Sequence, residues 1–374
     1  MVAAGGPNPH PASLVGLAAV LAVLGFGAVE TVLTFNRPGP VIPHAWADIA
    51  TGKASAAIAA RLDDNLPARD ALIMAANGLK YRLENGGPDS VRVGRDGWLY
   101  LTDELRVFPH GAEALTYRAN LLQAVSEHLR ARGVHLLVAL VPDKGRVYPA
   151  FLPGGHRAAA LAGRLGDFAR ALASRGVDAI NLLPAEQAAA NTGLAYYRTD
   201  THWNATGARA AAQAIAEHVR ALGLDLPPAR FVTRVAGPKT SRPGDLLRLM
   251  GLKFAPDWLR PAPDVDVPVH TTREDNPGGG ALLGAAVVPV TVTGTSFSLR
   301  GNFGGYLEQA LGAAVLNAAQ EGAGFARSTA EYLANPAFAN NPPRLLVWEV
   351  PERFIQEPVT AERTFLKDAN LGGR

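Results

Sequence analysis

The alternation of helical and strand patterns along the chain is the feature that most constrains its fold. Helix-spaced apolar residues end repeatedly at a glycine, and a short Val- and Leu-rich run follows. This alternation predicts an α/β fold with a mostly parallel sheet and helices on both faces. The expected helices are 112–132, 161–174 and 205–222, and the expected strands are 134–141, 177–183, 287–293 and 345–350.

An aspartate and a histidine lie two positions apart, at Asp200 and His202, just before the third expected helix. In an extended segment, side chains at i and i+2 point to the same side. An Asp beside a His can orient the ring, fix its tautomer and stabilise the imidazolium, which is the supporting role in a nucleophilic triad. The alternative is a chance pair in which the histidine is a surface or packed residue.

Such a pair needs a nucleophile, and Ser296 is the candidate. A β-branched run stops at Gly294 and presents hydroxyls at the expected end of a strand. An ordinary turn, in which glycine supplies the backbone angle and hydroxyls cap the next segment, is the alternative. Reacting groups in parallel α/β folds gather at the carboxyl ends of strands, and this favours the catalytic interpretation.

Composition excludes several other chemistries. The 374 residues include no cysteine, which excludes disulfides, thiolate metal sites and cysteine catalysis. The 36 basic and 33 acidic residues are mixed along the chain, so no nucleic-acid partner is expected. The nine histidines form no ligand-spaced cluster with carboxylates, so neither a metal nor another cofactor is expected.

Residues 1–36 are expected to anchor the chain in a membrane. From Leu14 to Phe35 the sequence is apolar apart from one glutamate and two threonines, and as a helix this segment would span roughly 33 Å. The alternatives are a cleaved signal sequence and a buried core helix. Because no convincing small-x-small site follows the apolar run, an uncleaved single-pass anchor is favoured, with the large following domain outside the cytoplasm.

The remainder of the chain divides into two parts. Residues 37–88 begin with a proline-rich linker and continue with Ala-rich amphipathic patterns, which predict a helical lead-in. The main domain is expected over 89–374 and opens with a hairpin at 91–101, around an Arg-Asp-Gly turn. Residues 253–284 are rich in Pro, Asp and Gly without periodicity, so they are expected to form a surface insertion or a lid.

An ordered set of motifs across residues 90–355 resembles the alginate O-acetyltransferase family, of the AlgX and AlgJ type. The combination is more specific than any single motif. The motifs are GRDGWLY (94–100), VPDK (141–144) with VYP (147–149), YRTDTHW (197–203) with GA (207–208), GDL (244–246), GTSFS (294–298), NF (302–303) and WEVPER (348–353).

The resemblance implies a periplasmic SGNH-hydrolase-like domain in which the Asp-x-His pair precedes the serine in sequence. Ser296 would be the nucleophile, His202 the general base and Asp200 its orienter. The enzyme would form an acetyl-enzyme and pass the acetyl group to a hydroxyl of an exopolysaccharide such as alginate. A carbohydrate esterase of the same fold and a noncatalytic envelope scaffold are the alternatives.

Four further residues in the motifs are candidates for the oxyanion or the substrate. Asn302 would assist the Ser296 amide at the oxyanion, with a loop cap as the alternative. For Lys144, Trp203 and Arg353 the alternatives are a solvated loop charge, core packing and a structural ion pair. Members of the family can have a tyrosine directly after the Pro-Glu-Arg motif, whereas this chain has Phe354, so no hydroxyl assists at that position.

The resemblance favours the AlgJ type over the AlgX type. The AlgX type carries a carbohydrate-binding domain after the catalytic one, and only about 20 residues follow Arg353 here. The implied partners are the polysaccharide acceptor, the inner membrane and a multipass membrane acyltransferase that supplies acetyl groups.

Overall fold

The central sheet in the computed structural model has five parallel strands in the order β10, β9, β11, β3, β4. The structure describes residues 25–33, 36, 41–65, 69–274 and 288–369. The strands are β3 (His135–Val141), β4 (Ala179–Asn181), β9 (Val290–Thr293), β10 (Val315–Asn317) and β11 (Leu345–Pro351). The predicted parallel α/β sheet is therefore confirmed, and β10 is an edge strand that the sequence pattern did not predict.

Strands β3 and β11 are buried on both faces, which explains why they read as continuous apolar runs. Along β3, Leu137, Ala139 and Val141 belong to one apolar cluster, whereas Leu136 and Val138 belong to another. Because successive strand residues point to opposite sides, the two clusters occupy the two faces of the sheet.

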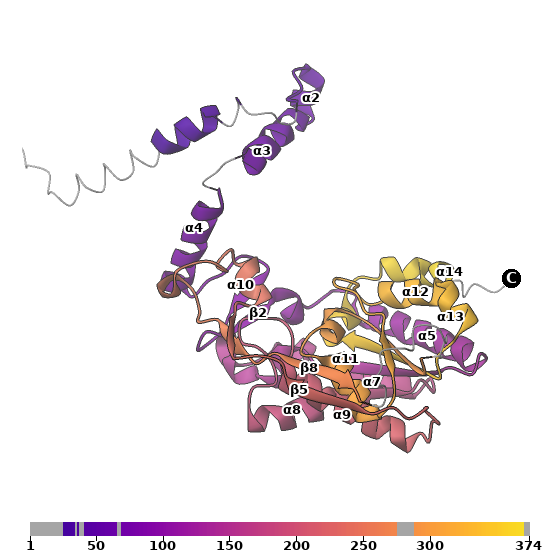
Figure 1. Ribbon diagram of the computed structural model, residues 1–374. Coiled ribbons are helices and arrows are strands. Elements are labelled where there is room, and N and C mark those ends of the chain that lie inside the picture. Colours follow the sequence, from indigo (N-terminus) through magenta and orange to yellow (C-terminus); the bar gives the residue numbers. More distant parts are fainter. Residues whose placement is uncertain (1–24, 34–35, 37–40, 66–68, 275–287, 370–374) are drawn as a thin grey trace, which may run out of the picture. The chain divides into compact units, whose positions relative to one another are not determined.

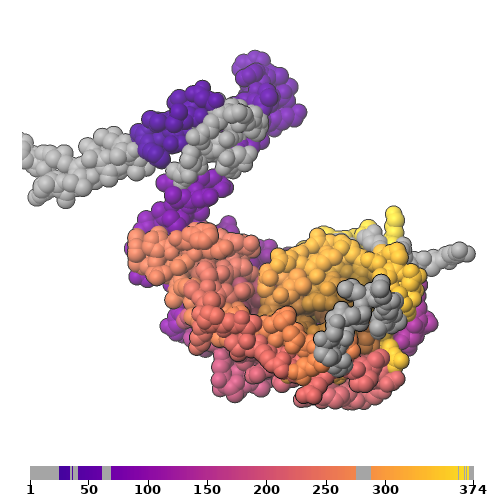
Figure 2. Space-filling model, in the orientation of Figure 1, coloured from indigo at the N-terminus to yellow at the C-terminus, as the bar shows by residue number. Residues whose placement is uncertain are grey.

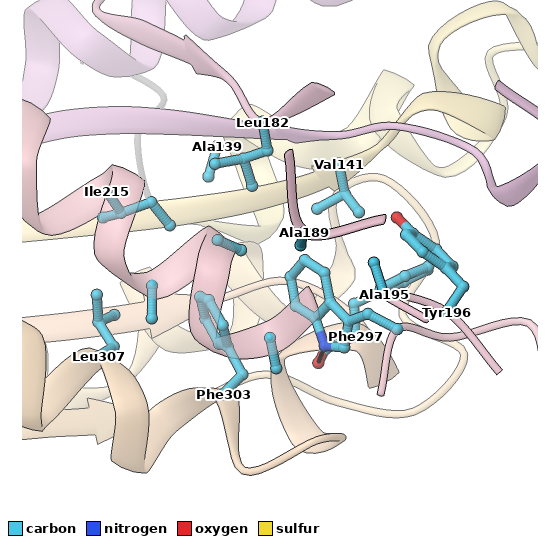
Figure 3. Packing of buried hydrophobic residues seen from close by; sticks show 14 of the residues in the cluster. Ala139, Val141, Leu182, Ala189, Ala195, Tyr196, Ile215, Phe297, Phe303 and Leu307 are labelled. Atoms are coloured by element: carbon cyan, nitrogen blue, oxygen red, sulfur yellow. Dashed lines mark hydrogen bonds between the residues drawn. The ribbon is translucent and has the colours of Figure 1, made fainter. Parts of the chain in front are cut away.

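Helices cover each face through these clusters (Figure 1). Packed with the first cluster are α8 (Leu183–Thr192), α9 (Ala205–Ala221) and α11 (Phe303–Leu311). Packed with the second are α5 (Gly111–Arg130), α7 (Arg164–Ala173), α12 (Arg327–Ala334), α13 (Pro336–Asn340) and α14 (Phe365–Asp368). Figure 3 shows part of the first cluster, to which Ile215 of α9, Phe303 and Leu307 of α11, and Phe297 all belong.

Short antiparallel pairs lie outside the main sheet. The predicted hairpin is confirmed: β1 (Val91–Val93) pairs with β2 (Leu99–Leu101), and Asp96 and Gly97 take positive φ angles in the turn. Two other pairs use the region predicted as a loop-rich insertion. Its described part contains β7 (Asp264–Asp266), which pairs with β6 (Thr240–Arg242), and β8 (Val269–Arg273), which pairs with β5 (Phe231–Val235).

The chain divides into two compact units at the junction of Ala76 and Asn77. The first contains α2 (Trp46–Ala50) and α3 (Lys53–Asn65), and α4 (Arg69–Glu84) extends across the junction. The expected membrane anchor, residues 1–36, falls largely outside the described residues. Among the residues that are described, none of the helices has the length and apolar character needed to cross a bilayer.

Glu186 introduces a pH dependence into the stability of this fold. It is buried where α8 packs against α9, and within the described structure neither of its carboxylate oxygens has a hydrogen-bond partner. Burial raises the pKa of Glu186 from 4.5 to about 8. Because the folded state keeps this proton to a higher pH than the unfolded chain, folding stability decreases as pH rises between these two values.

We expect Glu186→Gln to remove this part of the pH dependence. At about 1.4 kcal/mol per pKa unit, Glu186 accounts for a loss of at most about 5 kcal/mol. Denaturant unfolding of both proteins at about pH 5 and about pH 9 measures the effect. The free energy of unfolding should fall further in the wild type than in the variant, and equal falls would contradict the assignment.

Candidate active site

Asp200, His202 and Ser296 form one hydrogen-bonded chain. His202 Nδ1 lies 2.6 Å from Asp200 Oδ1, and His202 Nε2 lies 2.7 Å from Ser296 Oγ. Asp200 and His202 are buried, and Ser296 is half-buried. With Nδ1–H donating to the carboxylate, Nε2 is free to accept the serine proton. This arrangement can generate a serine nucleophile.

Ser296 owes its position to a sharp turn at the carboxyl end of β9. It begins the 3-10 helix η6 (Ser296–Leu299), two residues beyond Gly294. Gly294 has φ +147, and a Cβ there would lie 2.5 Å from the carboxylate of Glu349, so only glycine fits. The turn thus allows the backbone to pass close to β11.

Glu349 of β11 holds this turn in place through hydrogen bonds. Its carboxylate accepts hydrogen bonds from the Thr295 amide at 2.7 Å, from the Thr295 hydroxyl and from Ser298 Oγ at 3.0 Å. Burial raises the pKa of Glu349, and these hydrogen bonds oppose the rise. A single buried carboxylate therefore binds residues on both sides of Ser296.

The loop that carries Asp200 and His202 is held by a buried lysine. The Lys144 ammonium group is fully buried and donates to the carbonyl oxygens of Tyr197, Arg198 and Asp200 at 3.2, 3.2 and 2.7 Å. Burial lowers the pKa of Lys144, and nearby carboxylates, first among them Glu104, oppose this. The lysine binds the backbone of the loop and does not reach the cleft.

Two aspartates complete the support of the loop. Asp264 accepts from the amides of Arg198 and Thr199, each at 2.8 Å. Asp245 accepts from the Thr201 amide at 2.8 Å and from the Thr201 hydroxyl at 2.5 Å. Buried backbone donors in this irregular segment are thereby satisfied by side chains.

The second oxygen of Asp200 is also occupied. It accepts from the Asp245 amide at 3.1 Å and from Arg242 Nη2 at 3.3 Å, and the Arg242 guanidinium stacks 4.6 Å from the Tyr197 ring. Burial alone would raise the pKa of Asp200, but His202 and Arg242 together hold it below its usual range. Asp200 therefore stays ionised and keeps its acceptor role.

The three hydrogen-bonded residues, Asp200, His202 and Ser296, line a cleft of about 420 Å³. Four cationic side chains contribute to its wall. The lining residues are Asp200, His202, Arg242, Pro243, Gly244, Asp245, Arg248, Lys253, Ser296, Arg300, Glu321 and Gly322. Within this lining Arg242 pairs with Asp200 and Arg300 with Glu321, so the wall is mixed in charge and suits a strongly polar ligand at Ser296.

The structure brings together the three predicted catalytic residues but not the four further candidates. Among the described residues, the lining of this cleft does not include Asn302, Lys144, Trp203 or Arg353. The Asn302 amide donates to Thr271 Oγ1 at 2.9 Å, and the buried Trp203 indole donates to the carbonyl of Phe297 at 3.0 Å.

Arg353 is likewise buried. Its guanidinium lies 5.4 Å from the Phe297 ring and 4.7 Å from the Phe354 ring. The neighbouring carboxylate, Glu352, does not form the alternative ion pair with Arg353; it binds Arg146, Arg157 and Arg164. Both Trp203 and Arg353 therefore support Phe297, the residue after the serine. Trp203 binds its carbonyl oxygen, and Arg353 contacts its ring.

Sequence reasoning gave no role to Arg242, Asp245, Asp264 or Glu349. Asp245 and Glu349 stood within recognised motifs, which was the available signal for them. Arg242 and Asp264 lay in segments without a motif, and Asp264 lay in the expected insertion. All four act on partners 42 to 65 positions away, which no local pattern reveals.

Asp200, His202 and Asp245 have ligand-type atoms within 4.8 Å of one another. The same atoms are already engaged: Asp200 binds the imidazole and Arg242, and Asp245 binds Thr201. A cation there would have to displace the hydrogen bonds that orient His202 toward Ser296. These three side chains therefore fit a hydrogen-bonded catalytic triad better than a metal site.

Comparison with known proteins gives the same interpretation. The family model described as an SGNH hydrolase-like domain, acetyltransferase AlgX, matches residues 91–352. A relative named probable alginate O-acetylase AlgJ, from Pseudomonas aeruginosa, is 35% identical over 82% of this chain and 81% of its own length. An alginate biosynthesis protein AlgX from Pseudomonas putida is 31% identical over 72% of this chain and 57% of its own length.

Structural similarity points to the AlgJ type as well. The solved O-acetyltransferase domain of Pseudomonas putida AlgJ superimposes with a TM-score of 0.67 at 31% identity, over 76% of this chain and 99% of that domain. Together with the match over residues 91–352, this shows that the chain belongs to the AlgX family of SGNH hydrolase-like acetyltransferases and is more similar to its AlgJ members.

Proposed function

We propose that this protein O-acetylates alginate or a similar anionic exopolysaccharide through an acetyl-enzyme on Ser296. The observation that carries the proposal is the chain from Asp200 through His202 to Ser296, which opens into a cleft with four cationic side chains. The AlgJ relatives, named as alginate O-acetylases, support the choice of reaction and polymer.

In the first half-reaction, the Ser296 hydroxyl gives its proton to His202 Nε2 while its oxygen attacks the carbonyl carbon of an acetyl ester. The resulting oxyanion collapses, His202 returns the proton to the departing alcohol, and an acetyl ester of Ser296 remains. Asp200 stabilises the imidazolium that exists between these events.

In the second half-reaction, a sugar hydroxyl gives its proton to His202 and attacks the acetyl-enzyme. Ser296 leaves with the proton that His202 carries, and the acetylated sugar is released. The Ser296 amide is the proposed oxyanion donor; Asn302 is the proposed second donor from the sequence motif, but its amide donates to Thr271 and it lies outside the described lining of the cleft.

We propose that residues 1–36 anchor the chain in the inner membrane and that the catalytic domain lies in the periplasm. The apolar run from Leu14 supports the anchor. A multipass membrane acyltransferase is the proposed acetyl supplier, because the reaction needs an activated acetyl donor on the same side as the polymer. Carbonate extraction of membranes tests the anchor: release of the chain into the soluble fraction would contradict it.

Incubation of the full chain with an acetyl-ester donor and an oligouronate acceptor tests the reaction. Acetylated oligouronate in the mass spectrum supports the transferase. Free acetate without acetylated sugar would instead support an esterase, and neither product with any of several donors would support a scaffold.

Ser296→Ala should abolish the acetyl-enzyme, because the attacking oxygen is lost. Intact-mass measurement after brief exposure to donor should show one added acetyl group in the wild type and none in the variant. Ser174→Ala, which alters an exposed serine at the end of α7, is the matched control and should still be acetylated. Turnover that survives in Ser296→Ala would refute the assignment of the nucleophile.

Asp200→Asn should lower kcat by about 10⁴-fold, because an amide favours the wrong tautomer of His202 and cannot stabilise the imidazolium. Steady-state kinetics with an oligouronate acceptor measures this. Asp178→Asn is the matched control: Asp178 also binds histidines, His135 and His218, but it precedes β4 at the opposite end of the sheet. A similar loss in both variants would contradict a specific role for Asp200.

Lys144→Met should lower kcat and destabilise the fold by about 1 to 3 kcal/mol, because three buried carbonyl groups lose their donor. A lysine that bound substrate would mainly raise KM instead. Kinetics and denaturant unfolding separate these outcomes, with exposed Lys239→Met as the control. An increase in KM alone, at unchanged stability, would restore the substrate-binding role.

A further inference from the structure

The segment Leu249–Trp258 exposes large apolar side chains beside the catalytic cleft. Phe254 is 84% exposed, Trp258 66% and Leu249 43%. Exposed aromatic groups of this size cost solvation free energy and commonly mark binding surfaces. We refer to Leu249, Lys253, Phe254 and Trp258 as the ledge.

The ledge is not a loose loop. Between its exposed residues, Met250, Leu252 and Ala255 are buried, and so is Leu259, which follows Trp258. Asn77 of α4 donates to the Met250 carbonyl at 2.9 Å, and Arg260 bonds both to the Lys253 carbonyl and to Asp257. The aromatic rings therefore project from a fixed backbone, which lowers the entropic cost of binding a ligand.

The ledge is continuous with the wall of the cleft. Arg248 and Lys253 line the same cleft as Ser296, and Lys253 Nζ lies 5.0 Å from the centre of the Phe254 ring. The ammonium group thus connects the cleft to the exposed rings. In Figure 2 the orange segment that includes α10 (Asp245–Leu249) forms part of the molecular surface.

We propose that the ledge binds the acceptor polymer, an anionic pyranose chain, outside the cleft, and this rests on the proposed function. Trp258 and Phe254 would stack on the apolar faces of sugar rings, while Lys253 would pair with a ring carboxylate. The polymer would cross the ledge and place one hydroxyl at Ser296.

Charge and position favour this occupant over a membrane surface. An aromatic and basic patch also fits an anionic bilayer. The cation of the ledge, however, is shared with the cleft that holds the nucleophile, so a ligand that covers Lys253 also approaches Ser296. A polymer that enters the cleft satisfies both observations.

Binding to oligouronates tests the proposal without turnover. In a Ser296→Ala background, we expect Phe254→Ala and Trp258→Ala together to weaken the binding of long oligouronates about tenfold or more by calorimetry. Short oligouronates that fill only the cleft should bind with a smaller change. Lys253→Gln should reduce the dependence of binding on salt concentration.

Trp46→Ala is the matched control, because it removes an exposed tryptophan from the other structural unit. Thermal unfolding confirms that the variants are folded. Unchanged oligouronate affinity in the aromatic double variant would overturn the proposal, and so would an equal loss in Trp46→Ala. The proposal also fails if the double variant loses only co-sedimentation with phosphatidylglycerol vesicles.

The proposed function can fail separately. The protein with wild-type Ser296 can be assayed for hydrolysis of a small acetyl ester. This assay measures the activity of Asp200, His202 and Ser296 in the absence of the polymer. If this activity is present, and the Phe254→Ala and Trp258→Ala double variant with wild-type Ser296 still binds and acetylates long oligouronates normally, only the ledge proposal is wrong. If the wild type binds no oligouronate at all, the ledge proposal fails together with the choice of polymer.

Discussion

The buried carboxylate of Asp200 is the constraint on which the rest of the site depends. The residue is only 3% exposed, and a buried charge is tolerated only when it is paired and hydrogen-bonded. His202, the Asp245 amide and Arg242 provide the partners. Satisfying this charge fixes the imidazole, and the orientation of the imidazole fixes where a serine must lie.

The two loops of the site are built by the same physical means. In each, a buried group from elsewhere in the fold satisfies backbone atoms: Lys144 binds three carbonyls of the histidine loop, and Glu349 binds the turn that carries Ser296. Lys144 lies three residues beyond the carboxyl end of β3, and Glu349 lies two residues before the carboxyl end of β11. The sheet therefore sets the distance between base and nucleophile, which lie 94 residues apart in sequence.

Local patterns sufficed for the sheet, the hairpin and the catalytic candidates, because apolar periodicity and the Asp-x-His spacing are short-range signals. They did not reveal β10 or β7, because β10 is largely exposed and β7 carries two aspartates, so neither shows an apolar run. Nor could they distinguish a buried lysine from a solvated one, since the burial of Lys144 depends on partners more than 50 positions away. Asp264 was missed for the same reason.

The catalytic chain alone does not decide between hydrolysis and transfer, because water can attack the acetyl-enzyme as readily as a free hydroxyl can. Transfer prevails when the acceptor hydroxyl is held near the ester at a high effective concentration, which in well-oriented systems reaches on the order of 10⁵ M or more. Groups outside the reacting atoms must supply that positioning. In the described part of the chain, Arg248 and Lys253 of the cleft wall and the exposed rings of Phe254 and Trp258 are suited to do so.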